Sequence, residues 1–591
     1  MYPALHDDLV RDTDQLRILL EQHSTETIVG MTNAMLMRWF GHDPEPSPLV
    51  SPMRQVFFML GIMLTTPEPA KPWSFGDIAF ARAVALLNSI FHKYSLMYWP
   101  ESAPLASMPP EWKAIREVAM LTFLYYFNTM LTASIEQVRD RVRRYLCPFD
   151  AEFLAILGIS ASGALAATDW LARQFQRGAD TMVDFANAEL HARRRLLDQA
   201  EAHGWDLDRL RRQATEGAYA QTSADLIQSL SSFMKVDPRL MQAELGTDSA
   251  DAYWKRFVSV RGTTTTFTYL TELNPAEDRP LICLPDGRAM CPSPNVLYTA
   301  VLEGLERDIL ASPNRVRFLS HRDGALEEEA TTQFNRLFPP ESIFRNLFET
   351  QDLQNEHDLI ALCDKTLLIV ECKAATPREP LRDPEKAFVR IRDDFRSKRG
   401  IQGAFDQATG LLSTLNTAGR LRLFDSRRKE VLTLDKRNIA RTYVACITRD
   451  TYGPLAVDLS LLLEKPPSAP YPWSIGILDL TYMIDAWTYF RLGLDEFLSF
   501  LDQRAALHGK VTTSDELELV GFYLEHGSLS PLFNLEADHV TLSIDYSDIL
   551  DKVYAVTLGG SPPTLSPKEP QIRFVGPRVA IVSPPKPTHA A

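Results

Sequence analysis

The residue types best suited to chemistry lie in one short stretch. Asp358 precedes the triplet Glu371-Cys372-Lys373, and two apolar, β-prone runs between them flank a polar pair at 364–365. This pattern predicts an antiparallel hairpin, and a turn centred on that pair places Asp358 opposite Glu371, with Cβ atoms about 5 Å apart. Two carboxylates that face each other in an apolar hairpin repel unless a cation lies between them. Hard oxygen ligands suit Mg²⁺ or Mn²⁺, so the spacing predicts a divalent-metal site.

The lysine of the triplet belongs to the same face as the two carboxylates. Side chains alternate along a strand, so Glu371 and Lys373 point to one side of the hairpin. That face therefore carries a metal pair beside a cation that can hold a phosphate oxygen or orient a water molecule. The alternative is a surface hairpin whose wet face happens to be charged. The apolar run 367–370 implies burial on both faces and favours the metal site.

These residues carry a resemblance to a known family. The pattern Asp358…Glu371-Cys372-Lys373 resembles the signature of the PD-(D/E)xK nuclease superfamily, the restriction-endonuclease-like proteins related to Mrr and to the nuclease-related domain. The resemblance covers roughly residues 320–450, and one departure is Asn355-Glu356-His357 in place of a proline before the aspartate. The order of predicted elements agrees with the αβββαβ core of that family: a helix at 324–338, a strand at 342–348, the two strands of the hairpin, a helix at 400–417 and a strand at 441–448.

The resemblance implies roles for particular residues. Asp358, Glu371 and the backbone carbonyl of Cys372 are expected to bind Mg²⁺ or Mn²⁺. Lys373 is expected to steer the attacking water or to steady the charge that develops on the phosphate.

Two more positions follow from the family pattern. Many members carry a glutamate on the first helix, where it extends the metal site. Glu327 fits this position best, and Glu328 is the second candidate. The alternative is that these acids only stabilise the start of the helix through its dipole. Related members carry a glutamine on the helix after the hairpin, where it helps to place the lysine or the backbone. Gln407 suits that position better than Gln402, and the alternative is a solvated side chain.

Composition limits the class of protein. The 591 residues are 45% hydrophobic and 23% charged, which is ordinary for a soluble protein of about three domains. The six cysteines are scattered without a CxxC pair, which argues against a zinc-finger or disulfide framework and fits a reducing cytoplasm. The sequence contains no GxxxxGK[ST] motif, so ATP hydrolysis by the chain itself is not expected. The uncharged stretch 118–135 is expected to form buried core helix rather than a membrane span.

The charge is unevenly distributed along the chain. The net charge is −14, but residues 371–450 hold eighteen basic and eleven acidic side chains, a local charge of +7. Basic residues at 390–399 and 420–429 could follow a phosphate backbone, which favours nucleic acid as the partner. The alternative is a pair of solvated loops, because Asp393-Asp394 interrupts the first group.

The chain is expected to be a multidomain α+β protein. A large α-helical N-terminal accessory region (1–255) comes first, followed by a small α/β connector (256–320). The restriction-endonuclease-like nuclease domain occupies 321–465, and a mostly helical C-terminal segment occupies 466–560. The last 31 residues (561–591) contain eight prolines and are expected to be a loosely ordered tail.

Together these features predict a Mg²⁺-dependent endonuclease, a cytoplasmic hydrolase that cleaves nucleic acid, DNA rather than RNA. The helical N-terminal region is expected to recognise a protein partner, a substrate end or a signal, without membrane attachment. Analogy alone suggests a bacterial anti-phage defence role. The alternatives are an RNA-directed nuclease and a catalytically silent nuclease fold that serves as a binding or scaffold module. The sequence leaves the oligomeric state open.

Overall fold

The protein is a mixed α/β chain with a helical N-terminal region and several mixed sheets. The computed structural model describes residues 2–40, 47–98, 110–128, 134–376, 384–565, 569–576 and 578–585. These residues form two compact units. The first unit holds residues 1–97 and 129–318, and the second holds 98–128 and 319–591.

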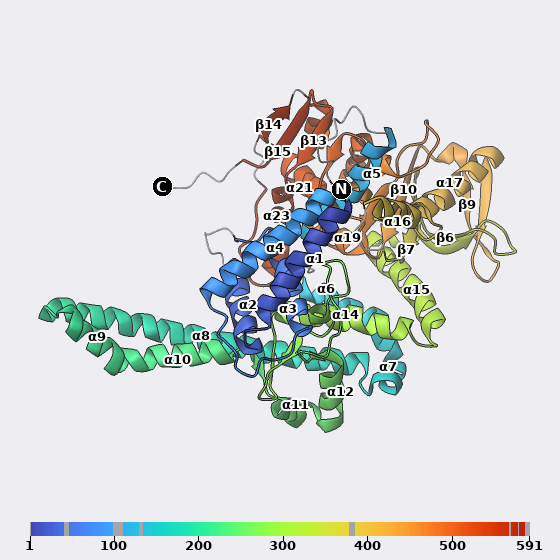
Figure 1. Ribbon diagram of the computed structural model, residues 1–591. Coiled ribbons are helices and arrows are strands. Elements are labelled where there is room, and N and C mark those ends of the chain that lie inside the picture. The colour runs from blue at the N-terminus through green and yellow to red at the C-terminus, as the bar shows by residue number, and fades with distance from the viewer. Residues whose placement is uncertain are drawn as a thin grey trace. The chain divides into compact units, whose positions relative to one another are not determined.

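The first unit is almost entirely helical (Figure 1). Its four short strands form one sheet in the order β1-β4-β3-β2. The helices are α1 (Tyr2–Leu20), α2 (Thr25–Phe40), α3 (Pro52–Leu64), α4 (Asp77–Tyr98), α6 (Ile135–Arg141), α7 (Asp150–Leu157), α8 (Ala161–His203), α9 (Leu207–Glu216), α10 (Ala218–Ser232), α11 (Pro238–Leu245), α12 (Thr247–Phe257), α13 (Pro275–Asp278) and α14 (Pro294–Leu310). The strands are β1 (Lys235–Val236), β2 (Val258–Ser259), β3 (Leu281–Cys283) and β4 (Ala289–Met290).

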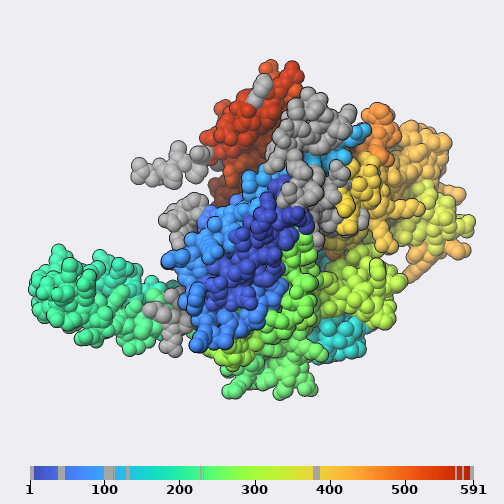
Figure 2. All heavy atoms as spheres, in the orientation of Figure 1, coloured from blue at the N-terminus to red at the C-terminus, as the bar shows by residue number. Residues whose placement is uncertain are grey.

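Helices α8, α9 and α10 form a long arm within this unit (Figures 1 and 2). Helix α8 runs for 43 residues, because the side chain of Ser160 caps its first turn and no proline interrupts its interior. Gly204 ends the helix with φ of 58°, a conformation that glycine adopts at little cost. Helix α10 then runs back beside α8 and packs against it.

The second unit contains the predicted nuclease region. Helix α5 belongs to it and packs against α16 and α18. Its helices are α5 (Pro110–Asn128), α15 (Arg315–Phe334, which begins just before the unit boundary), α16 (Pro384–Arg396), α17 (Ile401–Ala418), α18 (Pro454–Val457), α19 (Ile477–Tyr489), α20 (Leu494–Arg504), α21 (Glu516–His526), α22 (Ser530–Asn534) and α23 (Asp548–Thr557). Its strands are β5 (Ile343–Phe348), β6 (Glu356–Cys363), β7 (Thr366–Lys373), β8 (Arg420–Phe424), β9 (Glu430–Asp435), β10 (Arg441–Thr448), β11 (Trp473–Gly476), β12 (Val511–Thr512), β13 (His539–Leu542), β14 (Gln571–Gly576) and β15 (Val579–Ser583).

A seven-stranded sheet, in the order β11-β10-β7-β6-β5-β8-β9, organises this unit. Strands β7, β10 and β11 are parallel, whereas β5, β6 and β7 pair antiparallel. The predicted hairpin register is confirmed, because Leu359 pairs with Val370. Asp364 and Lys365 form the two-residue turn with φ of 44° and 68°, the left-handed conformation that tight hairpins require.

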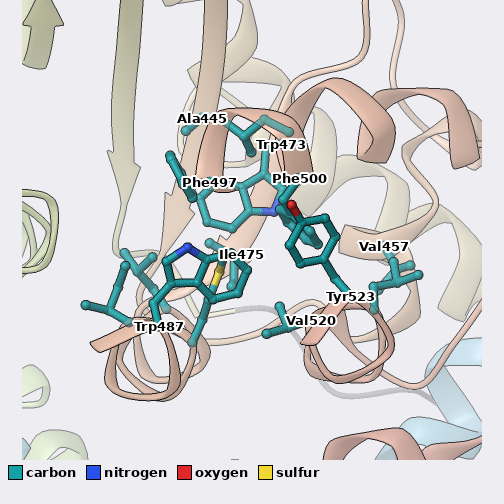
Figure 3. Close-up of a cluster of buried hydrophobic side chains, with 14 of the residues drawn as sticks. Ala445, Val457, Trp473, Ile475, Trp487, Phe497, Phe500, Val520 and Tyr523 are labelled. Atoms are coloured by element: carbon teal, nitrogen blue, oxygen red, sulfur yellow. The ribbon is translucent and has the colours of Figure 1, made fainter. Parts of the chain in front are cut away.

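Helices cover both faces of the sheet. Leu326, Ala330 and Phe334 of the first helix are fully buried against the face that carries Leu359 and Val370. That helix, α15, starts earlier than predicted and ends at Phe334, before the two prolines at 339–340. Helix α17 covers the opposite face through buried residues that include Ala408, Leu411 and Leu415. A large aromatic core that contains Trp473, Trp487 and Phe500 extends from the first face into the C-terminal helices (Figure 3).

The C-terminal tail differs from the prediction. Residues 571–583 form β14 and β15, which join β12 and β13 in a sheet of order β12-β13-β15-β14. Apart from Pro577, which separates the two strands, the prolines of the tail lie before β14 or after β15, and Ala580 and Val582 are buried. A count of prolines therefore misses a short apolar strand between them. Residues 566–568, 577 and 586–591 of the tail lie outside the described residues.

No single helix among the described residues is long and apolar enough to cross a membrane. The segments 135–157 and 161–203 reach that length and composition only as a bent pair. Residues 129–133 of the uncharged stretch lie outside the described residues.

Candidate active site

A row of polar side chains crosses the seven-stranded sheet. Asn346 stands between the pairs Arg345–Leu359 and Leu347–His357 and is therefore opposite Asp358. The hairpin register places Asp358 opposite Glu371, and the parallel ladders place Glu371 beside Cys446 and Cys446 beside Ser474. Five neighbouring strands thus each contribute one polar residue to a single row: Asn346, Asp358, Glu371, Cys446 and Ser474.

Asp358 is fixed by the backbone of the facing strand. Its Oδ2 accepts a hydrogen bond of 2.7 Å from the N–H of Cys372. Burial raises the pKa of Asp358, and the Lys373 ammonium and the Cys372 N–H offset this only in part. The carboxyl group is therefore held in an oriented, poorly solvated position, where a bound cation would favour its charged form.

Lys373 and Gln407 are in contact, as the family resemblance implies. The Nζ of Lys373 donates to Oε1 of Gln407 at 3.0 Å, and Nε2 of Gln407 donates to the backbone carbonyl of Glu356. The glutamine therefore joins the end of β7 to the start of β6 and holds the lysine beside both. Gln402, the weaker candidate, donates to Asp406 and to the Glu464 carbonyl instead.

Glu371 is paired with a histidine that the sequence analysis did not select. Its Oε1 lies 2.8 Å from Nδ1 of His357, whose Nε2 lies 3.2 Å from Oε1 of Glu349. Burial works to lower the pKa of His357, but the hydrogen bonds to the two carboxylates outweigh it and raise that pKa to about 9. Burial also raises the pKa of Glu371 to about 7, against the effect of the histidine. His357 therefore acts as a buried cation that orients Glu371.

A local irregularity explains why His357 reaches Glu371. Strict alternation would put His357 and Glu371 on opposite faces of the hairpin. Asn346, opposite Asp358, has a φ of 50°, which kinks the strand. The next residue, Leu347, pairs with His357 and packs in the same cluster as Ile360. The kink thus turns His357 to the α17 face. Alternation along the sequence cannot reveal such a kink, and the only sequence signal was a histidine adjacent to the aspartate.

Several buried oxygen atoms in this region have no hydrogen-bond partner among the described residues. Glu371 itself is fully buried, and its Oε2 is one of these atoms. Thr448 Oγ1 is another, on the strand position that pairs with Lys373. Buried polar atoms normally have partners, so the unpartnered carboxylate oxygen of Glu371 indicates a place for a cation or for water. The others in the row are Asn346 Oδ1 and Ser474 Oγ.

Helix α15 distinguishes the two glutamate candidates. Glu327 is partly buried, and burial together with the nearby charge of Asp358 raises its pKa to about 7. Glu328 is exposed. The structure therefore brings Glu327, and not Glu328, toward Asp358.

The basic residues at 390–399 and 420–429 form two groups that differ in their ion pairs. In the first, Arg396 pairs with Glu464 at 2.6 Å and Arg392 pairs with Asp393 at 2.9 Å. Arg422 of the second pairs with Glu430 at 3.6 Å. Other exposed members are Lys398 and Arg399, in the turn before α17, and Arg427, Arg428 and Lys429, at the tip of the β8–β9 hairpin.

The donor set fits a hard divalent cation in part. Among the described residues, no three or more His, Cys, Asp or Glu side chains converge as a metal-binding group. Asp358 and Glu371 nevertheless interact, and each uses one oxygen in a hydrogen bond. The unpartnered Oε2 of Glu371 is the oxygen atom that remains for a cation, together with Asp358 and the carbonyl of Cys372.

Comparison of the chain with family models, with curated proteins and with solved structures found no match in any of the three.

Proposed function

We propose that the protein is a metal-dependent nuclease that hydrolyses phosphodiester bonds in nucleic acid, DNA in preference to RNA. The observation that carries the proposal is the hairpin register, which sets Asp358 across from Glu371 on facing strands, beside a lysine held by Gln407. The buried Oε2 of Glu371, which lacks a partner among the described residues, supports a cation between the two carboxylates.

The order of elements supports a restriction-endonuclease-like core. Helix α15, strands β5, β6 and β7, helix α17 and strand β10 follow one another as the αβββαβ pattern requires. Two further strands, β8 and β9, lie between α17 and β10 and extend the sheet at the β5 edge. In this proposal the nuclease domain belongs to the second unit, and the helical first unit recognises a protein partner or a signal, for example in anti-phage defence.

Asp358, Glu371 and the Cys372 carbonyl would hold Mg²⁺ or Mn²⁺, with Glu327 as a further ligand. A divalent ion at this place supplies Lewis-acid polarisation of a phosphate oxygen and lowers the pKa of bound water.

The chain's own groups have separate tasks around this centre. The Cys372 N–H orients Asp358, and the His357 cation orients Glu371 while leaving its Oε2 available. Gln407 keeps the Lys373 ammonium at the end of β7, where it can neutralise the charge that develops on a phosphate. The exposed basic side chains at 398–399 and 427–429 would contact the phosphate backbone.

A silent binding module remains the second candidate, and one observation favours it. Oε1 of Glu371 is occupied by His357, so the hairpin carboxylates are stabilised without any metal. A fold that has lost catalysis could keep this ion pair for structure alone. The same site could also act on RNA, since nothing in the carboxylate–lysine arrangement selects the sugar.

A substrate panel tests the proposal. Supercoiled plasmid, linear duplex, single-stranded DNA and RNA are each incubated with the full chain and Mg²⁺, Mn²⁺ or EDTA. Asp358→Asn is the inactive variant, and Asp364→Asn in the hairpin turn is the matched control, because asparagine tolerates the left-handed backbone there. Cleavage that requires metal, is lost in Asp358→Asn and persists in Asp364→Asn supports the proposal. Equal cleavage by both variants contradicts it, and no cleavage by the native chain favours the silent module.

A further inference from the structure

A cavity of about 640 Å³ lies at the open edge of the seven-stranded sheet in the second unit. Strand β10 pairs with β7 over its whole length, from Arg441 to Thr448. Strand β11 pairs with β10 only from Ala445 onward. The first half of β10 therefore has a strand partner on one side alone among the described residues, and its residues 442–444 line the cavity.

The sequence explains why β11 begins late. If β11 were extended toward its N-terminus in the same register, residues 469–472 would pair with residues 441–444. Pro470 and Pro472 have no N–H and cannot complete the ladder at two alternate positions. Residues 469–472 instead form a wall of the cavity, so a wedge remains between them and β10.

Both helical layers contribute to the walls. Phe405 and Ser413 come from α17, and Leu501 comes from α20. Trp473, which lies among aromatic side chains in Figure 3, and Tyr471 add aromatic surface. Trp473 directs its indole N–H to Glu516 at 2.9 Å and is otherwise buried, so the part of this side chain that lines the cavity is its apolar ring.

The chemistry of the cavity indicates its occupant. A free strand edge presents backbone N–H and C=O groups in alternation, as the edge of a nucleobase does. Aromatic walls suit a flat ring, and a volume of this size is typical of small-molecule sites. Lys436 is exposed, and it lines both this cavity and the adjacent surface hollow near Arg420, which places a cation at the mouth.

We propose that this cavity binds a nucleotide, with the base against the open edge of β10 and the phosphate at Lys436. The nucleotide can come from two sources, a free mononucleotide or the end of a nucleic-acid strand. The site is separate from the Asp358–Glu371 pair, and its occupancy does not depend on cleavage. Helix α17 lines the cavity and also carries Gln407, so the two sites share one helix.

Isothermal titration of the full chain with AMP, GMP and adenosine tests the proposal. Ser413→Trp fills the cavity, and Ser413→Ala at the same position is the matched control. We expect Ser413→Trp to weaken the binding of AMP or GMP at least about tenfold, and Ser413→Ala to weaken it less than about twofold. Lys436→Met is expected to weaken AMP binding and to leave adenosine binding unchanged. Thr442→Trp repeats the filling from the strand side if Ser413→Trp does not fold.

Two outcomes overturn the proposal. One is the absence of binding by all three compounds to the folded native chain. The other is binding that both filled variants retain, because the nucleotide would then lie elsewhere. Asp358→Asn is expected to bind AMP normally, which separates this result from any failure of the proposed cleavage. If a single-stranded octanucleotide displaces AMP from Asp358→Asn, the natural occupant is the end of a nucleic-acid strand. If the octanucleotide does not displace AMP, the natural occupant is a free mononucleotide.

Discussion

His357 offers the sharpest test of how the candidate site is held together. This side chain is 1% exposed and lies between two carboxylates, with Glu371 itself fully buried. Replacement of His357 by glutamine keeps a polar side chain but removes the positive charge. Glu371 is then left as a buried carboxylate beside Asp358, without its hydrogen-bonded cation.

The expected cost follows from this geometry. Removal of one partner of a buried ion pair costs about 3–5 kcal/mol, because the other charge remains buried and uncompensated. Neither side chain of the His357–Glu371 pair is exposed, so screening by solvent does not reduce this energy. We expect His357→Gln to lower the free energy of unfolding of the second unit by this amount. The double variant His357→Gln/Glu371→Gln should recover about 2 kcal/mol of it, because the unpaired charge is gone.

Hydrogen exchange of peptides from β6 and β7, followed by mass spectrometry, measures this effect in the unit concerned. The two strands are central in the sheet, so their slowest amides report unfolding of the whole unit. His539→Gln, a partly exposed histidine of the same unit, serves as the control. A loss below about 1 kcal/mol in His357→Gln, or a double variant no more stable than the single one, would refute the proposed stabilisation of Glu371 by His357.

Three further predictions concern this unit. Gln407→Ala removes the hydrogen bond to Lys373 and should reduce nucleic-acid cleavage by about 10–100-fold without a change in thermal midpoint, measured on the substrate panel. Arg504→Met breaks the buried pair with Glu516, at 2.8 Å, and should destabilise the unit by about 3–5 kcal/mol in urea unfolding. Burial raises the pKa of Glu518 to about 10, so folding favours the protonated form of this side chain. Stability is therefore lost as the pH rises from the pKa of Glu518 in the unfolded chain toward its pKa in the folded chain. Glu518→Gln should therefore raise the thermal midpoint at pH 9 and change it little at pH 4, and a stabilisation that is larger at pH 4 would contradict this sign.

Local chemistry made the hairpin predictable. Two apolar, β-prone runs and a polar pair at 364–365 set the register that places Asp358 opposite Glu371, and the structure has that register. The contact between Lys373 and Gln407 is also present, because a helix that packs on the sheet brings Gln407 to the end of β7.

Features that depend on distant pairing could not be read from the sequence. The kink at Asn346, which turns His357 toward Glu371, arises where β5 pairs with β6, and a positive φ at an asparagine has no unique sequence signal. The choice of Glu327 over Glu328 depends on the rotation of α15 against the sheet. The strands β14 and β15 were missed because their stability comes from pairing with β13 and not from local composition.

Calorimetric titration with Mn²⁺ tests the central claim most directly, because it asks whether the carboxylate pair holds a divalent cation whatever the substrate. The account predicts that the native chain and Asp364→Asn bind Mn²⁺ alike and that Asp358→Asn loses this binding while it remains folded. An Asp358→Asn variant that binds Mn²⁺ as the native chain does, or a native chain that binds none, would contradict it.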